Sequence, residues 1–156
     1  MSKNSKLNVL GVMTGTSMDG VDISLINTNG TDFVKIKCEK SYKFYKHYQK
    51  TINNLIINKP KTNNKIKEYF LKKDKFVTDI LEKKIILFLK QKKINKKNID
   101  LISISGQTVY HDPSNKISIQ LGNGNKIAKN LKVKTISNLR DNAVSYTHLT
   151  LPTIDR

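Results

Sequence analysis

The sequence predicts an α/β domain with a mixed sheet that opens in a β-meander and is flanked by helices. Two apolar runs, 7–12 and 21–26, enclose a turn-forming segment, which is typical of a β-hairpin. Residues 64–94 then change to the three- and four-residue period of a helix, and a short apolar run at 99–104 follows as a strand. We expect one domain, because 156 residues form a sizeable core but not two ordinary ones.

A third strand follows the hairpin after the turn 29–32, because residues 33–38 alternate between apolar and polar. A short helix is expected over 48–57 and ends before Pro60, since the residue preceding a proline avoids the α region. The helix over 64–94, which we allow one break, carries apolar side chains on one face and lysines on the other. The apolar stripe consists of Ile66, Tyr69, Phe70, Val77, Ile80, Leu81, Ile85 and Phe88.

The strand over 99–104 is apolar enough to be buried on both faces. It delivers residues 105–108 to its carboxyl end, where ligands collect in open α/β sheets. Three further elements are predicted: a strand over 116–121, a short helix over 126–131 capped by the turn 122–125, and a last strand over 133–137.

The formal net charge of +17 would normally point to nucleic acid or an anionic membrane as partner. Here the lysines run through helices, strands and loops alike, and arginine, the residue best suited to phosphate contacts, occurs only at Arg140 and Arg156. The single cysteine, Cys38, excludes an internal disulfide, and the first ten residues lack an apolar core of signal-peptide length. We therefore expect a soluble cytoplasmic protein that has no membrane partner.

The turn at 14–20 carries the strongest indication of chemistry. Three hydroxyl side chains can donate to oxygen anions, two carboxylates can hold a hydrated magnesium ion, and two glycines are expected to take positive φ and let a ligand approach the amides. The same residue types also make an ordinary surface turn, so composition alone leaves both interpretations open. The hydroxyl side chains are those of Thr14, Thr16 and Ser17, the carboxylates are those of Asp19 and Asp22, and the glycines are Gly15 and Gly20.

The block MTGTSMDGVD, residues 13–22, resembles the N-terminal phosphate-binding signature of the anhydro-N-acetylmuramic acid kinases. A second block, SGQTVYHDP at 105–113 followed by ISIQLGNGNKIA at 117–128, is similar to the same family. It departs from the family's pattern at Ser105, where the family has histidine, and at Asn123, where aspartate is common. A serine has no imidazole, so the role of that histidine is not carried over.

A third block, residues 135–141, resembles a family strand that ends in an aspartate-phenylalanine-arginine triplet, of which Arg140 remains. The resemblance ends past residue 142. We expect residues 1–142 to be a truncated N-terminal ATPase-like kinase domain. Residues 143–156, AVSYTHLTLPTIDR, are expected to be an artefactual or non-native tail.

The resemblance implies the first domain of the actin-like ATPase fold, shared by sugar kinases and heat-shock ATPases, in which ATP lies between two domains. It implies an ATP- and Mg2+-dependent kinase that opens the anhydro ring and forms N-acetylmuramic acid 6-phosphate in peptidoglycan recycling and amino sugar metabolism. A full-length member is expected to be a homodimer. The family's catalytic base lies beyond this chain, so we expect no turnover and weak or no ATP affinity from these residues. The ATP-binding residues implied are Gly15, Thr16, Ser17, Met18, Asp19, Gly20, Val21 and Asp22, and those facing the sugar are Gln107, Thr108 and Arg140.

Two other classes of function stay open. Tyrosines and lysines alternate over residues 42–50, which would suit a basic module that stacks on RNA or single-stranded DNA, although such a run is more often a packed strand end. A purely structural domain, whose turn binds nothing, is the third hypothesis.

Overall fold

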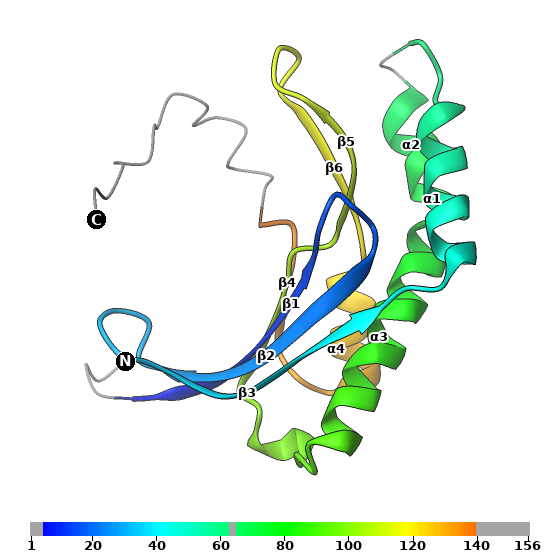
Figure 1. Cartoon of the computed structure of the whole chain (residues 1–156). Coiled ribbons are helices and arrows are strands. Elements are labelled where there is room, and N and C mark those ends of the chain that lie inside the picture. Colours follow the sequence, from blue (N-terminus) through cyan, green and yellow to red (C-terminus); the bar gives the residue numbers. More distant parts are fainter. Residues whose placement is uncertain (1–4, 63–64, 140–156) are drawn as a thin grey trace, which may run out of the picture.

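A computed structural model describes residues 5–62 and 65–139 of the chain. In this part, five strands form one mixed sheet and two more form a separate hairpin (Figure 1). The sheet order is β3 (Val34–Lys43), β2 (Gly20–Thr28), β1 (Leu7–Thr14), β4 (Leu101–Ile104) and β7 (Thr135–Ile136), and the hairpin consists of β5 (Gln107–Asp112) and β6 (Ile117–Leu121).

The first three strands are the predicted meander. β1 and β2 pair antiparallel from Leu7 opposite Thr28 to Thr14 opposite Val21, and β2 pairs antiparallel with β3. A register shift between Leu25 and Ile26 marks a bulge in the second pairing. β4 lies parallel to β1, and β7 lies parallel to β4, so the sheet becomes parallel on this side. This arrangement confirms the predicted fold class.

All the helices of the described residues pack on one side of the sheet (Figure 1). The predicted long helix is broken once, at Lys72 and Lys73, where the amide of Lys73 donates to the Phe70 carbonyl at 3.0 Å. None of these helices has the length and apolar character needed to cross a bilayer. The helices are α1 (Lys46–Ile57), α2 (Ile66–Leu71), α3 (Asp74–Gln91) and α4 (Gly124–Leu131), with a short 3-10 turn, η2, at Lys96–Asn98.

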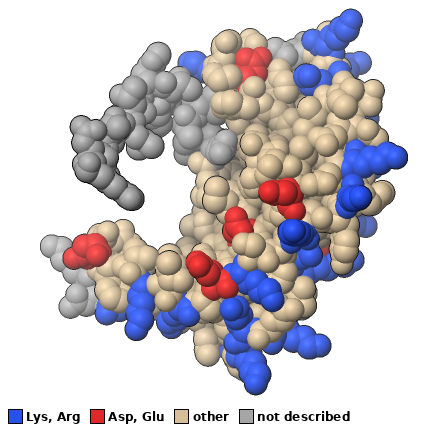
Figure 2. Space-filling view, viewed as in Figure 1, with Lys and Arg blue, Asp and Glu red and all other residues tan. Residues whose placement is uncertain are grey.

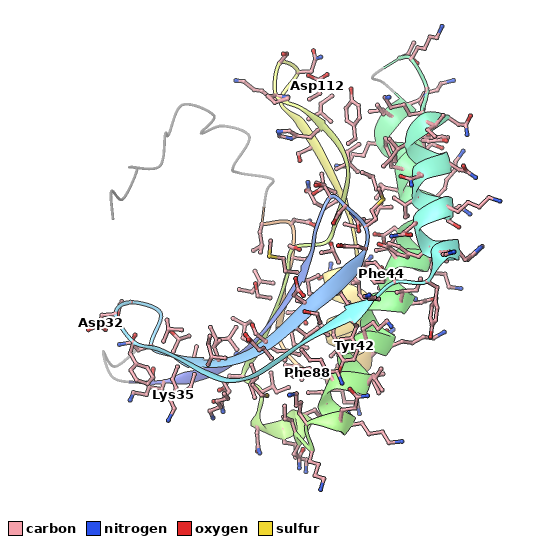
Figure 3. The ribbon with its side chains drawn as sticks, in the orientation of Figure 1. Asp32, Lys35, Tyr42, Phe44, Phe88 and Asp112 are labelled. Atoms are coloured by element: carbon pink, nitrogen blue, oxygen red, sulfur yellow. The ribbon has the colours of Figure 1, made fainter. Side chains whose placement is uncertain are left out.

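The core lies between these helices and the sheet. Alternate residues of β1 and β2 point into the core, and one face of α3 meets them, as the two hydrophobic periods predict. Figure 3 shows Tyr42 of β3 and Phe44, just after β3, on the side where α3 lies, and Phe88 on α3 itself. All three side chains are buried. The main buried residues are Leu10, Val12, Val21, Ile23 and Leu25 of β1 and β2 and Val77, Leu81, Ile85 and Phe88 of α3.

The prediction that the strand at 99–104 is buried on both faces is wrong. Ile102 and Ile104 are fully buried against the helices, but Leu101 and Ser103 are only half-buried. The reason is that no described element covers the opposite face of the sheet, which we call the open face.

Other elements also differ from expectation. β3 continues to Lys43 and α1 begins at Lys46, and β5, for which the sequence analysis names no element, alternates buried and half-buried residues from Gln107 to Tyr110. Helix α4 begins at Gly124, two residues early, and β7 spans two residues rather than 133–137. Arg140 and the tail at 143–156 lie outside the described residues.

Candidate functional site

The turn between β1 and β2 is open to solvent. Gly15, Thr16, Ser17 and Asp19 are exposed, and the amide of Met18 donates to the Gly15 carbonyl at 3.3 Å. The amides of Gly15, Thr16 and Ser17 donate to no residue that the structure describes. The turn therefore presents several main-chain donors without partners, which is the arrangement that an anion site uses.

The two glycines of the turn do not have the positive φ that we expected. The left-handed residue is Met18, with φ of 56°, and its side chain packs partly against the core. Gly20 is needed for another reason: a Cβ there would lie 2.6 Å from the carbonyl oxygen of Tyr42 on β3. Gly20 thus allows β2 and β3 to approach, while the bend itself comes from Met18.

Both carboxylates of the turn region are exposed and held by serines. Ser17 Oγ donates to Asp19 Oδ1 at 2.7 Å, and Ser41 Oγ of β3 donates to Asp22 Oδ1 at 2.5 Å. The Ser17 hydrogen bond is the main cause that lowers the pKa of Asp19, helped by main-chain amides and by the charge of Lys43. Asp19 is therefore ionised at neutral pH and adds negative charge to the turn.

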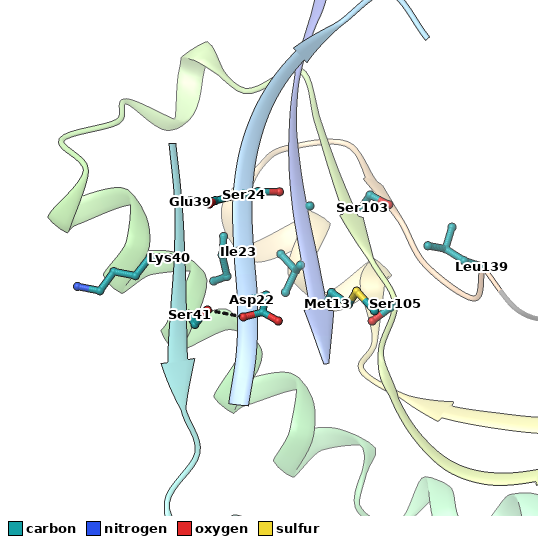
Figure 4. Close-up of a pocket in the computed structure, with 12 residues that line it drawn as sticks. Met13, Asp22, Ile23, Ser24, Glu39, Lys40, Ser41, Ser103, Ser105 and Leu139 are labelled. Carbon is teal, nitrogen blue, oxygen red and sulfur yellow. Dashed lines mark hydrogen bonds between the residues drawn. The ribbon is translucent and has the colours of Figure 1, made fainter. Parts of the chain in front are cut away.

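Two cavities meet on the open face of the sheet, and both include Met13, Asp22 and Ser41 in their walls. The first, of about 740 Å³, extends over the middle of the sheet and is floored by small residues such as Gly11, Ser24 and Ser103 (Figure 4). The second, of about 660 Å³, reaches the turn, where it is lined by Gly15, Ser17, Asp19, Gly20 and Lys43. Both volumes lie within the usual range for small-molecule sites.

No motif in the sequence indicates the part that β3 plays in these cavities. Ser41 and Lys43 enter the walls because they pair across the sheet with Asp22 and Gly20. Figure 4 shows Ser41 beside Asp22, whereas the side chain of Lys40 points away from the cavity.

The segment 105–107, which joins β4 to β5, contacts the start of the turn. The amide of Thr14 donates to Ser105 Oγ at 3.2 Å, and the Thr14 hydroxyl donates to the Gly106 carbonyl at 2.8 Å. Gln107 is fully buried, and its Nε2 donates to the Gly15 carbonyl at 3.0 Å. Ser105, which stands where the family has histidine, thus accepts a hydrogen bond from the Thr14 amide.

The predicted site residues fall into three groups. Gly15, Ser17, Asp19, Gly20 and Asp22 line the cavity at the open turn. Thr16 and Met18 belong to the turn but do not line the cavity, and the side chain of Val21 lies in the core. Gln107 touches the turn from inside, and Thr108 is half-buried on β5. Their predicted contact with a sugar stays a prediction, and Arg140 lies outside the described residues.

The turn before α4 is built as predicted. Asn123 caps the helix, its Oδ1 accepting from the Lys126 amide at 2.9 Å. Its own amide donates to Thr78 Oγ1 and that of Gly122 to Asp74 Oδ1, each at 2.8 Å, so α3 fixes the turn.

The aromatic segment 42–50 offers little stacking surface. Tyr42, Phe44 and Tyr48 are buried in the core, and Tyr45 alone among these four rings is exposed, at 79%. Figure 2 shows lysines spread over several elements of the visible face, with acidic residues among them. The described residues of this segment therefore offer one exposed tyrosine ring, Tyr45, and one exposed imidazole, His47, to a base.

Comparison with known proteins identifies the family. The family model for anhydro-N-acetylmuramic acid kinase matches residues 7–152, past the expected limit at 142. Curated relatives with that name include those of Pelagibacter ubique (34% identical, 86% of this chain and 36% of the relative), Sulfurimonas denitrificans (33%, 87% and 36%) and Bradyrhizobium diazoefficiens (27%, 86% and 37%). The chain thus spans little more than a third of the length of these relatives.

Proposed function

The chain belongs to the anhydro-N-acetylmuramic acid kinase family, and from this premise we propose that its open turn binds the phosphates of ATP in a sugar kinase. The whole protein would open the anhydro ring with water and transfer the γ-phosphoryl group to O6 of the sugar, in the cytoplasm, for peptidoglycan recycling. The observation that carries the proposal is the run of unpartnered amides at Gly15, Thr16 and Ser17 at the mouth of a cavity.

These donors fit the chemistry of phosphoryl transfer, which depends mainly on positioning and on stabilisation of negative charge. The Thr16 hydroxyl and the turn amides would contact phosphate oxygens, while Asp19 and Asp22 would hold a hydrated Mg2+. Lys43 lines the same cavity and adds a positive charge opposite the two carboxylates. Without cations, those carboxylates would repel the nucleotide.

The sugar side of the proposal rests on residues 107, 108 and 140, and a homodimer is proposed for the full-length protein. A general base must lie within hydrogen-bond reach of the water that it activates. We propose that this base is not among these 156 residues. The chain alone would then bind Mg-ATP weakly and show no turnover. Formation of N-acetylmuramic acid 6-phosphate by these residues would contradict this part.

Nuclear magnetic resonance titration of the 156-residue chain with Mg-ATP tests the site, because it detects millimolar binding. We expect shifts of the amides at 15–19. The turn at 29–32 is an internal control, since it is also polar and glycine-bearing but its amides at Asn29, Gly30 and Thr31 already donate to Phe33, Thr28 and Asn29. Equal shifts in both turns, or none at 15–19 at saturating nucleotide, would refute the proposed site.

A nucleic-acid-binding module remains the alternative from another class. It predicts that a single-stranded oligonucleotide shifts Tyr45 and the lysines around it, with an affinity that falls steeply as salt is raised. The same titration therefore separates the two functions.

A further inference from the structure

Gln107 is a buried polar side chain with an unusual set of partners. Its Nε2 donates to the carbonyls of Gly15, at 3.0 Å, and Thr108, at 3.3 Å. Its Oε1 accepts from the hydroxyl of Tyr48, at 3.1 Å. Carbonyl oxygens only accept, so the amide orientation is fixed by chemistry. Burial raises the pKa of the Tyr48 phenol, which keeps that hydroxyl a donor.

The bond to Gly15 has a consequence for the next amide. The carbonyl of Gly15 and the N–H of Thr16 belong to one trans peptide unit and point in opposite directions. The Gly15 carbonyl accepts from Gln107 at 3.0 Å and, more weakly by distance, from the Met18 amide at 3.3 Å. Because the shorter bond holds it toward the buried Gln107, the Thr16 N–H is turned away from the core. Thr16 is exposed, and its N–H is one of the unpartnered donors of the turn.

The neighbouring contacts fix the same stretch from the same side. Ser105 Oγ accepts from the amide of Thr14, and the Gly106 carbonyl accepts from its hydroxyl. Three consecutive residues, 105–107, thus hold two consecutive residues at the start of the turn. Gln107 alone among the three bonds to a group inside the turn itself.

We propose that Gln107 is a positioning residue for nucleotide, which holds the Gly15 carbonyl inward so that the Thr16 amide faces the phosphates, rather than a residue that contacts the sugar. The nucleotide in this inference rests on the proposed function, whereas the orientation of the Gly15–Thr16 peptide by Gln107 does not depend on it. Gln107 is fully buried, and both N–H groups of its amide already donate to main-chain carbonyls, so it has no free donor for a substrate in this arrangement.

The test compares Gln107→Leu, which keeps similar bulk but removes the donor, with Thr78→Val as the matched control. Thr78 is also fully buried and also uses its polar atom to donate and accept, but it bonds to Asp74 and Asn123, away from the turn. Both changes should lower stability. Gln107→Leu alone should change the Gly15 carbonyl shift and the residual dipolar coupling of the Thr16 N–H. It should also weaken Mg-ATP binding roughly ten- to a hundredfold, the loss of one charge-assisted hydrogen bond.

Gln107→Glu supplies a pH-dependent readout if the leucine variant unfolds. Burial raises the pKa of a carboxyl group, and only its protonated form can donate to the Gly15 carbonyl. The wild-type Thr16 signals should therefore return as pH falls through that raised pKa. The proposal is overturned if Gln107→Leu leaves the Thr16 orientation unchanged, or if Thr78→Val alters it equally. Should the wild-type chain show no Mg-ATP shifts, the proposed function fails, while the orientation data still decide the role of Gln107.

Discussion

The substitution Gly106→Ala tests the segment that joins β4 to β5 and supports the turn at 14–20. Gly106 has φ of +70°, and a Cβ there would lie 2.9 Å from the carbonyl oxygen of Leu121 and 3.1 Å from Cβ of Gln120. Its own carbonyl oxygen accepts from the Thr14 hydroxyl, so a shift of this residue reaches the first residue of the turn. We expect Gly106→Ala to destabilise the fold and to disturb the turn together.

Gly30 is the matched control, because it has φ of +80° but a Cβ there would meet nothing within 4 Å. A left-handed alanine costs roughly 1–2 kcal/mol, offset by about 0.4–1 kcal/mol from the stiffer unfolded chain. Gly30→Ala should therefore lower the free energy of unfolding by about 1 kcal/mol. Gly106→Ala adds a contact with backbone that cannot move aside, roughly 1–3 kcal/mol more, for a total of about 2–4 kcal/mol.

Urea unfolding followed by circular dichroism measures both losses, and an unchanged slope would show that only stability differs. Amide spectra of the two variants provide the second measurement: the Thr14 and Gly15 signals should move in Gly106→Ala and stay in place in Gly30→Ala. Equal free-energy losses in the two variants would refute the steric reasoning, since they share the backbone cost and differ only in the contact.

Three further substitutions test the turn and its supports. Gly20→Ala should lower the free energy of unfolding by roughly 1–3 kcal/mol in urea titration, because its Cβ would lie 2.6 Å from the Tyr42 carbonyl oxygen, and a neutral result would contradict the close approach of β2 and β3. Ser17→Ala should raise the pKa of Asp19, read by carboxyl carbon resonances, since the Ser17 hydrogen bond is the main cause that lowers it. Because the folded pKa is lowered, the contribution of Asp19 to stability is present above the ordinary carboxyl pKa and is lost as pH falls through the lowered value. In the variant the folded pKa lies closer to the ordinary value, so this loss should be smaller and should be complete at a higher pH. Ser105→Ala should cost about 1 kcal/mol in urea unfolding by removing the acceptor of the last β1 amide, and no loss would show that water replaces the hydroxyl.

The parts of the fold that depend on local pattern could be predicted from the sequence. In β2 every second residue is buried, at positions 21, 23 and 25, and in α3 buried residues recur every three or four positions, at 77, 81, 85 and 88. Each pattern is complete within one element, so no distant contact is needed to recognise it. The break between α2 and α3 was foreseen but not located, since Lys72 and Lys73 are ordinary helix formers.

The parts that depend on distant contacts could not be predicted. The tight approach at Gly20 depends on the Tyr42 carbonyl of β3, and the positive φ of the turn falls on Met18, whereas the sequence pointed to Gly15 and Gly20 as the residues that allow it. The positions of Ser41 and Lys43 beside the turn depend on the strand register, and a bulge such as the one at Leu25 and Ile26 shifts it by one residue and reverses the faces. The sugar contact of Gln107 is implied by the family resemblance, and its burial beneath the turn depends on a distant contact with Gly15.

The error about β4 has a physical meaning beyond that strand. Parallel strands are usually covered on both faces, and the run at 99–104 has the apolar composition for it. On the open face, however, the small residues Gly11, Ser24 and Ser103 floor a cavity near the turn. Farther along the same face, Val34 and Ile36 of β3 pair with Thr28 and Ile26 and remain about 60% exposed, at 63% and 60%. One end of the face is therefore the floor of a cavity, whereas the other end carries two exposed apolar side chains, and no described element covers either end.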